Sequence, residues 1–354
     1  MPQSPSLDAN RRHWIAVWLF VVAAMIFIIV VLGGLTRLTH SGLSMVEWKP
    51  VTGWLPPLTE AEWEETFAKY RQYPEYLEIN KGMTLTEFKG IFWLEFIHRV
   101  WGRIIGIAFF IPFVFFLAKG WVSGPLVRHL GAIFVLGGLQ GGLGWFMVKS
   151  GLVDRPDVSQ YRLAAHLCLA LVIFAYVMWV GLRLKFPVLH SVPAEFRRGA
   201  NGLIALIFVT IFSGALVAGL DAGLVYNTFP LMDGDLIPEG LFDQTPLFAN
   251  FFENIITVQF EHRVLAVLTL VLVLYYVFKL RRSQPAPSVG KAATALGAMA
   301  IVQVLLGITT LLLVVPVSVA SIHQAGAVVL LGFAVWVRAV MEDGARPGGG
   351  GTPT

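Results

Sequence analysis

Eight long apolar stretches, separated by polar connections, organise this chain. A helix needs about 20 predominantly apolar residues to cross the hydrocarbon core of a bilayer. The stretches close to or above this length are 14–35, 92–118, 127–148, 162–184, 202–220, 255–278, 292–314 and 319–341. The pattern predicts an all-α polytopic membrane protein with eight transmembrane helices.

The composition agrees with this prediction and excludes other classes. The chain is 56% hydrophobic, 13% aromatic and only 14% charged, whereas soluble domains are about 25% charged. Its single cysteine, Cys168, excludes an intrachain disulfide and a cysteine-based metal cluster. The net charge of +4 does not indicate nucleic-acid binding, because the basic residues are confined to particular loops.

The charged residues also predict the orientation of the chain. Arg11 and Arg12 precede the first stretch, and Lys and Arg residues crowd the even-numbered loops. The fifth loop, 221–254, carries six acidic residues and no Lys or Arg. By the positive-inside rule, both termini and the even-numbered loops are cytoplasmic and the fifth loop is outside. In the long outer loop 36–91, residues 60–80 resemble an amphipathic surface helix.

Four of the eight histidines occupy matching places near the predicted outer ends of the even-numbered stretches. They are His98, His166, His262 and His323. A single intramembrane histidine is as often a packing residue as a ligand, but four at one depth favour ligands. Zinc or copper would usually recruit Cys, Asp or a third close histidine. Haem needs only one or two axial imidazoles, so the sequence predicts two bis-histidine haem sites.

The two halves of the chain share further sequence motifs, which indicate an internal repeat. EFIHR at 95–99 matches QFEHR at 259–263, and Gln140 and Gln303 occupy corresponding places in the third and seventh stretches. Because each half has an even number of spans, we expect parallel repeats: two pseudo-symmetric four-helix bundles about an axis along the membrane normal. The predicted units are an N-terminal segment 1–13, a first bundle 14–184, a linker 185–201, a second bundle 202–341 and a disordered tail 342–354.

One difference between the halves suggests different chemistry. Glu95 stands three residues before His98 and therefore on the same helical face, while Gln259 takes that place before His262. Glu261 does not restore the carboxyl, because it points about 100° around the helix from His262. A carboxyl beside a haem can accept a proton or stabilise positive charge. The sequence predicts one reactive site and one electron-transfer site, with an ion pair to Arg99 or a loop cation as the structural alternative for Glu95.

Arg99 and Arg263 directly follow two of the histidines. An arginine near the outer interface can bind the carboxylates of haem propionates with two hydrogen bonds. The alternative is that both side chains extend to lipid phosphates or water. We retain both arginines as propionate candidates.

At these residues the sequence resembles the haem A synthase family, in the form found in α-proteobacteria and mitochondria. The resemblance covers nearly the whole chain, and its most specific texts are 34–39 (GLTRLT), 41–50 (SGLSMVEWKP), 95–99 and 219–230 (GLDAGLVYNTFP). It implies that the protein oxidises a methyl group of haem O to the formyl group of haem A, for aa3-type cytochrome oxidases.

The resemblance also implies roles for the candidate residues. His98 and His166 would face the substrate haem O, with Glu95 as the acidic catalytic residue. His262 and His323 would be the axial ligands of haem b. Some relatives carry cysteine pairs in the outer loops, and this chain has none.

The resemblance further implies a location and partners. We expect an integral protein of a bacterial inner membrane with its haem sites toward the periplasm. Haem O would be delivered by haem O synthase, an unknown acceptor would take the electrons, and the oligomeric state stays open.

Three other functions are compatible with parts of the pattern. A di-haem b-type cytochrome that only carries electrons explains the histidines but gives Glu95 no task. Such a cytochrome also usually places its two haems at opposite depths of the membrane, whereas these four histidines lie at one depth. A transporter or haem exporter predicts charges at the membrane midplane, where this chain has few. A haem O synthase needs an Asp-rich diphosphate motif in a cytoplasmic loop, which the sequence lacks.

Overall fold

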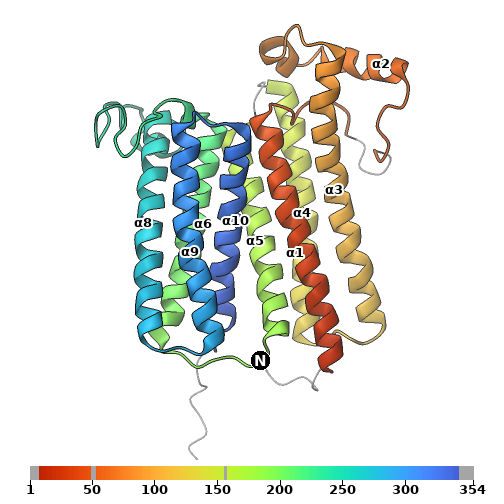
Figure 1. Cartoon of the computed structure of the whole chain (residues 1–354). Coiled ribbons are helices and arrows are strands. Elements are labelled where there is room, and N and C mark those ends of the chain that lie inside the picture. Colours follow the sequence, from red (N-terminus) through yellow and green to blue (C-terminus); the bar gives the residue numbers. More distant parts are fainter. Residues whose placement is uncertain (1–7, 49–52, 155–157, 343–354) are drawn as a thin grey trace, which may run out of the picture.

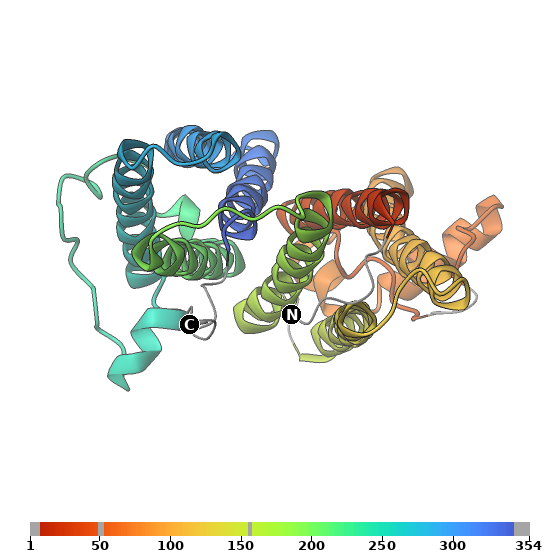
Figure 2. The ribbon, with the colours of Figure 1, turned by 90° about the horizontal axis from the view of Figure 1, so that it is seen from below.

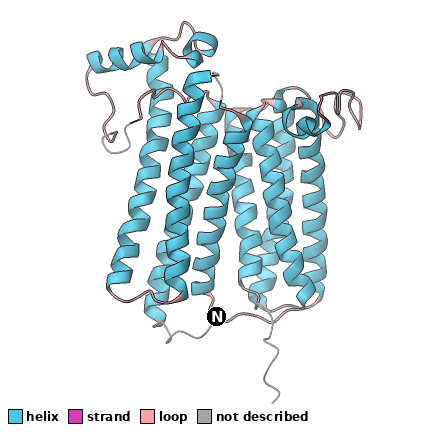
Figure 3. Ribbon diagram, turned by 180° about the vertical axis from the view of Figure 1, so that it is seen from behind, coloured by secondary structure: helices cyan, strands magenta, loops and turns pink. Residues whose placement is uncertain are grey.

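A computed structural model describes residues 8–48, 53–154 and 158–342, with side chains of 152–154 excepted. Within these residues, eight helices are long and apolar enough to cross a membrane, which confirms the predicted number of spans. They are α1 (Ala9–Leu38), α3 (Leu85–Ala118), α4 (Pro125–Asp154), α5 (Gln160–Lys185), α6 (Ala194–Gly219), α8 (Ile255–Arg282), α9 (Pro287–Leu312) and α10 (Val317–Ala339). The protein is an all-α integral membrane protein, and Figure 3 shows the described chain as helices joined by loops.

Several helices begin before the apolar stretches that predicted them. α3 begins at Leu85, where Thr84 and Glu87 form a capping box, and α6 begins at Ala194 after Pro193. The first turns of α6 carry Glu195 and two arginines but still bury Phe196 and Ala200. An apolar window detects only the part of a helix that lies in hydrocarbon, so it misses such polar turns at the interface.

The eight helices form two groups of four. α1, α3, α4 and α5 make one group and α6, α8, α9 and α10 the other, as the view along the helices shows (Figure 2). α5 packs against α6 and α10, and α1 against α10, so these four helices join the groups. The grouping agrees with the expected bundles, while the two-fold axis and the functional division at 14–184 and 202–341 stay predictions.

Apolar packing and polar contacts hold the groups together. The buried core runs through this contact and includes Leu19, Leu171 and Leu331. The Gln324 side chain on α10 donates to the carbonyl of Val30 on α1 at 3.0 Å. Gly34 provides the space for Gln324, because a Cβ there would lie 1.7 Å from Oε1 of the amide.

The two long loops, 39–84 and 220–254, lie at the same end of the molecule (Figure 1). α1 begins and α10 ends at the opposite end, as an even number of spans requires. An ion pair of 2.9 Å joins Arg37 at the end of α1 to Asp221 in the second loop. The side of the membrane that each end faces stays a prediction, and the predicted tail beyond Glu342 lies outside the described residues.

The first loop contains the helix expected over 60–80, but as two pieces. α2 (Glu60–Tyr70) starts at a Thr59–Glu62 capping box, and backbone N–H groups of Leu58 and Thr59 lower the pKa of Glu62. A turn then precedes η1, a π-helical segment at Glu75–Ile79. Pro74 accounts for the break, because proline disfavours helical backbone in the residue before it.

The apolar face of α2 packs on the N-terminal end of α3. Trp63, Phe67 and Tyr70 form a buried aromatic cluster with Phe88 and Phe92. The ring centroids of Phe67 and Phe88 are 4.9 Å apart. This packing fixes α2 to the end of α3 that carries the candidate site.

The second long loop has only short helical segments. They are η2 (Ala222–Leu224), η3 (Leu247–Ala249) and α7 (Asn250–Glu253). Asn250 anchors this loop from a fully buried position by exchanging two hydrogen bonds with the backbone of Gln244.

Candidate functional site

The four predicted histidines come from four parallel helices, one each from α3, α5, α8 and α10. His98 interacts electrostatically with His166, and His262 with His323, so the structure brings them together as two pairs. Within the described residues, no three His, Cys, Asp or Glu side chains gather as a metal-binding group. Each pair therefore offers imidazoles alone, which is the donor set that a haem iron accepts.

Each histidine ring lies against a glycine of a neighbouring helix. A Cβ built on that glycine would lie 2.9 to 3.0 Å from Cε1 of the ring, closer than nearly all real Cβ contacts. The glycine–histidine pairs are Gly33 with His98, Gly144 with His166, Gly214 with His262 and Gly307 with His323. These glycines fix how close each ring sits to its neighbouring helix.

In each pair, one histidine is hydrogen-bonded by a glutamine of a neighbouring helix. Gln140 on α4 donates through Nε2 to the carbonyl of His166 at 3.0 Å, and the same nitrogen lies 3.2 Å from the ring Nδ1. Gln303 on α9 makes the same contacts with His323, at 2.9 and 3.1 Å. The recurrence of Gln140 and Gln303 in the sequence therefore corresponds to a shared contact with the candidate ligands.

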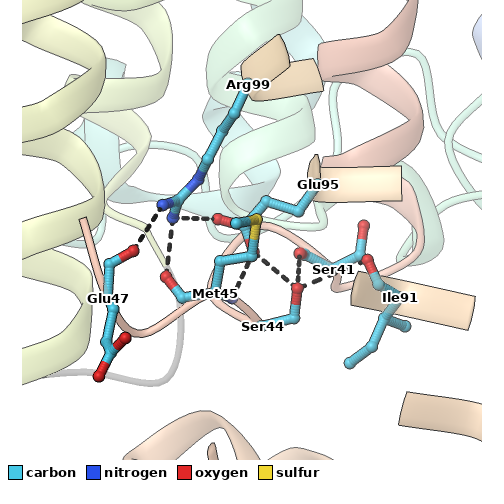
Figure 4. Close-up of polar contacts among 7 residues, drawn as sticks. All are labelled: Ser41, Ser44, Met45, Glu47, Ile91, Glu95 and Arg99. Atoms are coloured by element: carbon cyan, nitrogen blue, oxygen red, sulfur yellow. Dashed lines mark hydrogen bonds and ion pairs between the residues drawn. The ribbon is translucent and has the colours of Figure 1, made fainter. Parts of the chain in front are cut away.

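The candidate acid Glu95 is buried in a hydrogen-bond network with the first long loop (Figure 4). Its Oε2 accepts hydrogen bonds from the Ser44 hydroxyl at 2.7 Å and from the Met45 backbone N–H at 2.8 Å. Its Oε1 forms an ion pair with Arg99. Arg99 also donates to the carbonyls of Met45 and Glu47, at 2.8 and 3.2 Å. The structural alternative for Glu95, a pair with Arg99, is thus present.

The second half repeats this arrangement with a different donor pattern. Arg263 donates to the carbonyls of Tyr226 and Thr228 at 2.7 and 2.8 Å, alternate residues of the second outer loop. Gln259 is also buried, and its Nε2 donates to the Tyr226 carbonyl at 3.0 Å. Glu95 accepts from the loop backbone, whereas Gln259 donates to it.

The sequence matches the model of the COX15-CtaA family, described as Cytochrome oxidase assembly protein, over residues 16–335. The protein belongs to this cytochrome oxidase assembly family. Its curated relatives extend over nearly the full chain. The relative named Heme A synthase in Nitrosospira multiformis is 53% identical, covering 95% of this chain and 96% of its own.

Two more relatives are also named Heme A synthase. The Parvibaculum lavamentivorans protein is 54% identical and covers 93% of this chain and 94% of its own. The Paramagnetospirillum magneticum protein is 50% identical over the same shares, 93% and 94%. The resemblance drawn from the sequence is therefore confirmed at the level of the family.

In this family member, the two arginines proposed for propionates already bind loop carbonyls. Neither side chain therefore extends to lipid phosphates or water alone, which was the alternative to propionate binding. Within the described residues, Nε of both Arg99 and Arg263 is buried without a hydrogen-bond partner. The Nε–H group of each arginine is therefore available to a ligand, and the propionate role stays a prediction.

A pocket of about 390 Å³ lies on the N-terminal part of α3. It is lined by Thr39, Met83, Glu87, Gly90, Ile91 and Leu94. Glu87, Ile91, Leu94 and His98 follow one another at helical spacing, so they share one face of α3. The pocket therefore lies along the helical face that leads to His98, which sequence reasoning did not foresee.

Sequence reasoning also missed the residues that support the histidines. Gly144 and Gly307 stand at the same distance after Gln140 and Gln303, so the repeated text did contain a signal for them. Ser44 and the backbone of Met45 had no such signal, because their contact with Glu95 depends on how the first loop folds back over α3.

Proposed function

We propose that this protein is a haem A synthase. It acts as an oxidoreductase that converts a methyl group of haem O, through the hydroxymethyl compound, to the formyl group of haem A. The near full-length match to relatives named Heme A synthase supports this function. The observation that carries the reaction is the buried Glu95 beside the first histidine pair, where the second pair has Gln259.

The first half, residues 14–184, is the substrate domain in this proposal. His98 and His166 face the iron of haem O from opposite helices. The pocket on α3 lies on the helical face that carries His98, and the substrate approaches along this face in the proposal. Arg99 and Arg263 offer their free Nε–H groups to propionates.

The second half, residues 202–341, is suited to a resident haem b. Its two imidazoles come from facing helices. Each ring packs against a glycine, and a Cβ at that glycine would collide with the ring. His262 and His323 would hold the iron through these rings. Haem b supplies one-electron transfer when it is bound.

Each oxidation releases two electrons, which an external acceptor takes, and two protons. In the first, water supplies the oxygen, and in the second, the alcohol also loses its hydroxyl proton to give the aldehyde. In both, one of the protons comes from the substrate carbon. Glu95 is the group that takes this proton. Ser44 allows this, because its hydroxyl also lies 3.1 Å from the Ser41 carbonyl. When Oε2 is protonated, the Ser44 hydroxyl turns to Ser41 and accepts from the acid, while Arg99 keeps hold of Oε1.

The orientation in this proposal follows from the loop charges. The basic loops lie in the cytoplasm with both termini, and the histidine pairs lie toward the periplasmic face of the inner membrane. The long loops that contact Glu95 and Gln259 are then periplasmic. Substrate haem O would come from haem O synthase.

The test is chromatography of haems extracted from the purified protein, made in cells that supply haem O. The wild type should contain haem b together with haem O or haem A, and Glu95→Ala should lose haem A while keeping haem b. Glu261→Ala, beside the second histidine pair, is the matched control and should retain haem A. Haem b alone in every sample would overturn the synthase and leave an electron-carrying cytochrome.

A further inference from the structure

Side chains hold three of the four candidate ligand histidines, and His98 is the exception. The amides of Gln140 and Gln303 lie on the rings of His166 and His323. The Ser213 hydroxyl lies 2.9 Å from Nδ1 of His262. Nδ1 of His98 is buried without a hydrogen-bond partner within the described residues; the Leu32 carbonyl faces it outside hydrogen-bond geometry.

The direction of the Ser213 hydrogen bond follows from its second contact. The Ser213 hydroxyl donates its proton to the Thr210 carbonyl at 2.8 Å. In that arrangement its oxygen accepts from Nδ1–H of His262, 2.9 Å away. This bond fixes the tautomer that leaves Nε2 free for iron, and such a hydrogen bond strengthens the imidazole as a ligand.

The difference lies at corresponding positions. Ser213 directly precedes Gly214, which supports His262, and Leu32 directly precedes Gly33, which supports His98. The two sites therefore share a glycine contact and differ in one hydroxyl. Where α6 offers the ring a hydroxyl, α1 offers an apolar side chain and the Leu32 backbone carbonyl, which lies outside hydrogen-bond geometry.

We propose that Ser213 is a positioning residue that makes the second site retain its haem, and that Leu32 leaves His98 a readily exchanged ligand. The inference rests on the proposed function and adds to it how the substrate site releases its product. A synthase must let haem O in and haem A out at one site while keeping haem b at the other. An imidazole without a well-aligned partner on its second nitrogen binds iron less strongly and turns more easily.

The experiment compares two reciprocal substitutions in the detergent-purified, haem-loaded protein. Excess apomyoglobin serves as the acceptor, and the haem type that leaves is identified by extraction and chromatography. Ser213→Ala should accelerate loss of haem b by about 10- to 100-fold and shift its low-spin optical spectrum. Ser213→Thr, which restores the hydroxyl, should return both to the wild-type values.

Leu32→Ser tests the first site, with Leu32→Ala as the control for lost apolar volume. Leu32→Ser should slow the loss of haem O or haem A by about 10-fold relative to Leu32→Ala. This arm keeps the proposal testable if Ser213→Ala does not fold. Equal rates for Leu32→Ser and Leu32→Ala, or unchanged haem b loss and spectrum in a folded Ser213→Ala, would overturn it.

The two proposals can fail separately. A wild type that never yields haem A overturns the proposed function. A wild type that yields haem A, with haem release unaffected at both positions, overturns only the roles of Ser213 and Leu32.

Discussion

The two halves of the molecule fasten their outer loops in the same way, but they differ at one residue. In each half an arginine binds two alternate loop carbonyls. Glu95 accepts from a backbone N–H of its loop, whereas Gln259 donates to a backbone carbonyl. The comparison shows that a neutral amide is sufficient to anchor such a loop. A buried carboxylate at position 95 is therefore not required by the architecture, which favours a chemical role.

Exchanging the two side chains tests this difference most directly. Glu95→Gln should lower haem A formation by about 100-fold or more, because it removes the proton acceptor and keeps the size of the side chain. Haem A formation per protein is measured by extraction and chromatography. The reciprocal Gln259→Glu should leave it within a few-fold of the wild type. Near-normal haem A formation by Glu95→Gln would assign Glu95 to loop anchoring alone.

The arginines should differ in their contribution to stability. Arg99→Gln leaves the Glu95 carboxylate buried without its ion-pair partner, a change that typically costs about 3–5 kcal/mol. Arg263→Gln loses charge-assisted hydrogen bonds to carbonyls, worth about 1.5–3 kcal/mol. Thermal unfolding of both variants in the same detergent measures the difference. An equal loss of stability would mean that the Glu95 charge adds nothing to the first half.

The glycine contacts sharpen the comparison within single helices. Gly214→Ala should lower haem b content, because its Cβ would lie 2.9 Å from Cε1 of His262. Gly202→Ala on the same helix meets no atom within 4 Å. It should keep haem b and gain up to about 1 kcal/mol of stability, as alanine favours helix. Pyridine haemochrome spectra give the haem content, and equal content in both variants would argue against the supporting role of Gly214.

The same contrast is available in the first half. Gly144→Ala would press on His166, with a Cβ 3.0 Å from Cε1, whereas Gly142→Ala has open space. Substrate haem should be lost from the first variant and kept in the second. A loss confined to Gly214→Ala would show that only the second half depends on this contact.

The smallest effect is expected at the ion pair between the halves. Asp221→Asn removes the 2.9 Å contact with Arg37, and asparagine tolerates the left-handed backbone of that position. Half-exposed pairs contribute about 0–1 kcal/mol. We expect a small fall in the unfolding temperature that disappears at high salt. A larger, salt-independent loss would mean that this pair has a greater part in joining the groups than its exposure indicates.

The sequence was sufficient to predict features that depend on periodicity and repetition. Apolar runs predicted the eight spans, and the repeated texts predicted the two histidine pairs and the Glu95–Gln259 difference. The start of α6 at Ala194 was missed, because its polar first turns lie at the interface. The amphipathic pattern over 60–80 did not foresee the break before η1, where Pro74 acts locally.

Contacts between distant segments could not be predicted from the sequence. In the sequence, nothing distinguishes Ser44 from any other loop serine. Its hydrogen bond to Oε2 of Glu95 forms only when the loop folds over α3. Ser213 looks like an ordinary small residue of a membrane helix, and only the packing of α6 on α8 places it at His262. Both roles depend on which face of one helix meets another, which short-range patterns do not determine.

The four histidines also lie at a similar level of the bundle. His166, His262 and His323 lie within about two turns of the start of α5, α8 and α10. His98 lies further along α3, which extends beyond the other helices at that end (Figure 1). Electrons exchanged between the sites would travel parallel to the membrane plane. Moving a charge across the whole bilayer involves about 2.3 kcal/mol per 100 mV, but this sideways path crosses almost none of that field. The electron exchange between the sites should therefore proceed at the same rate in energised and de-energised vesicles.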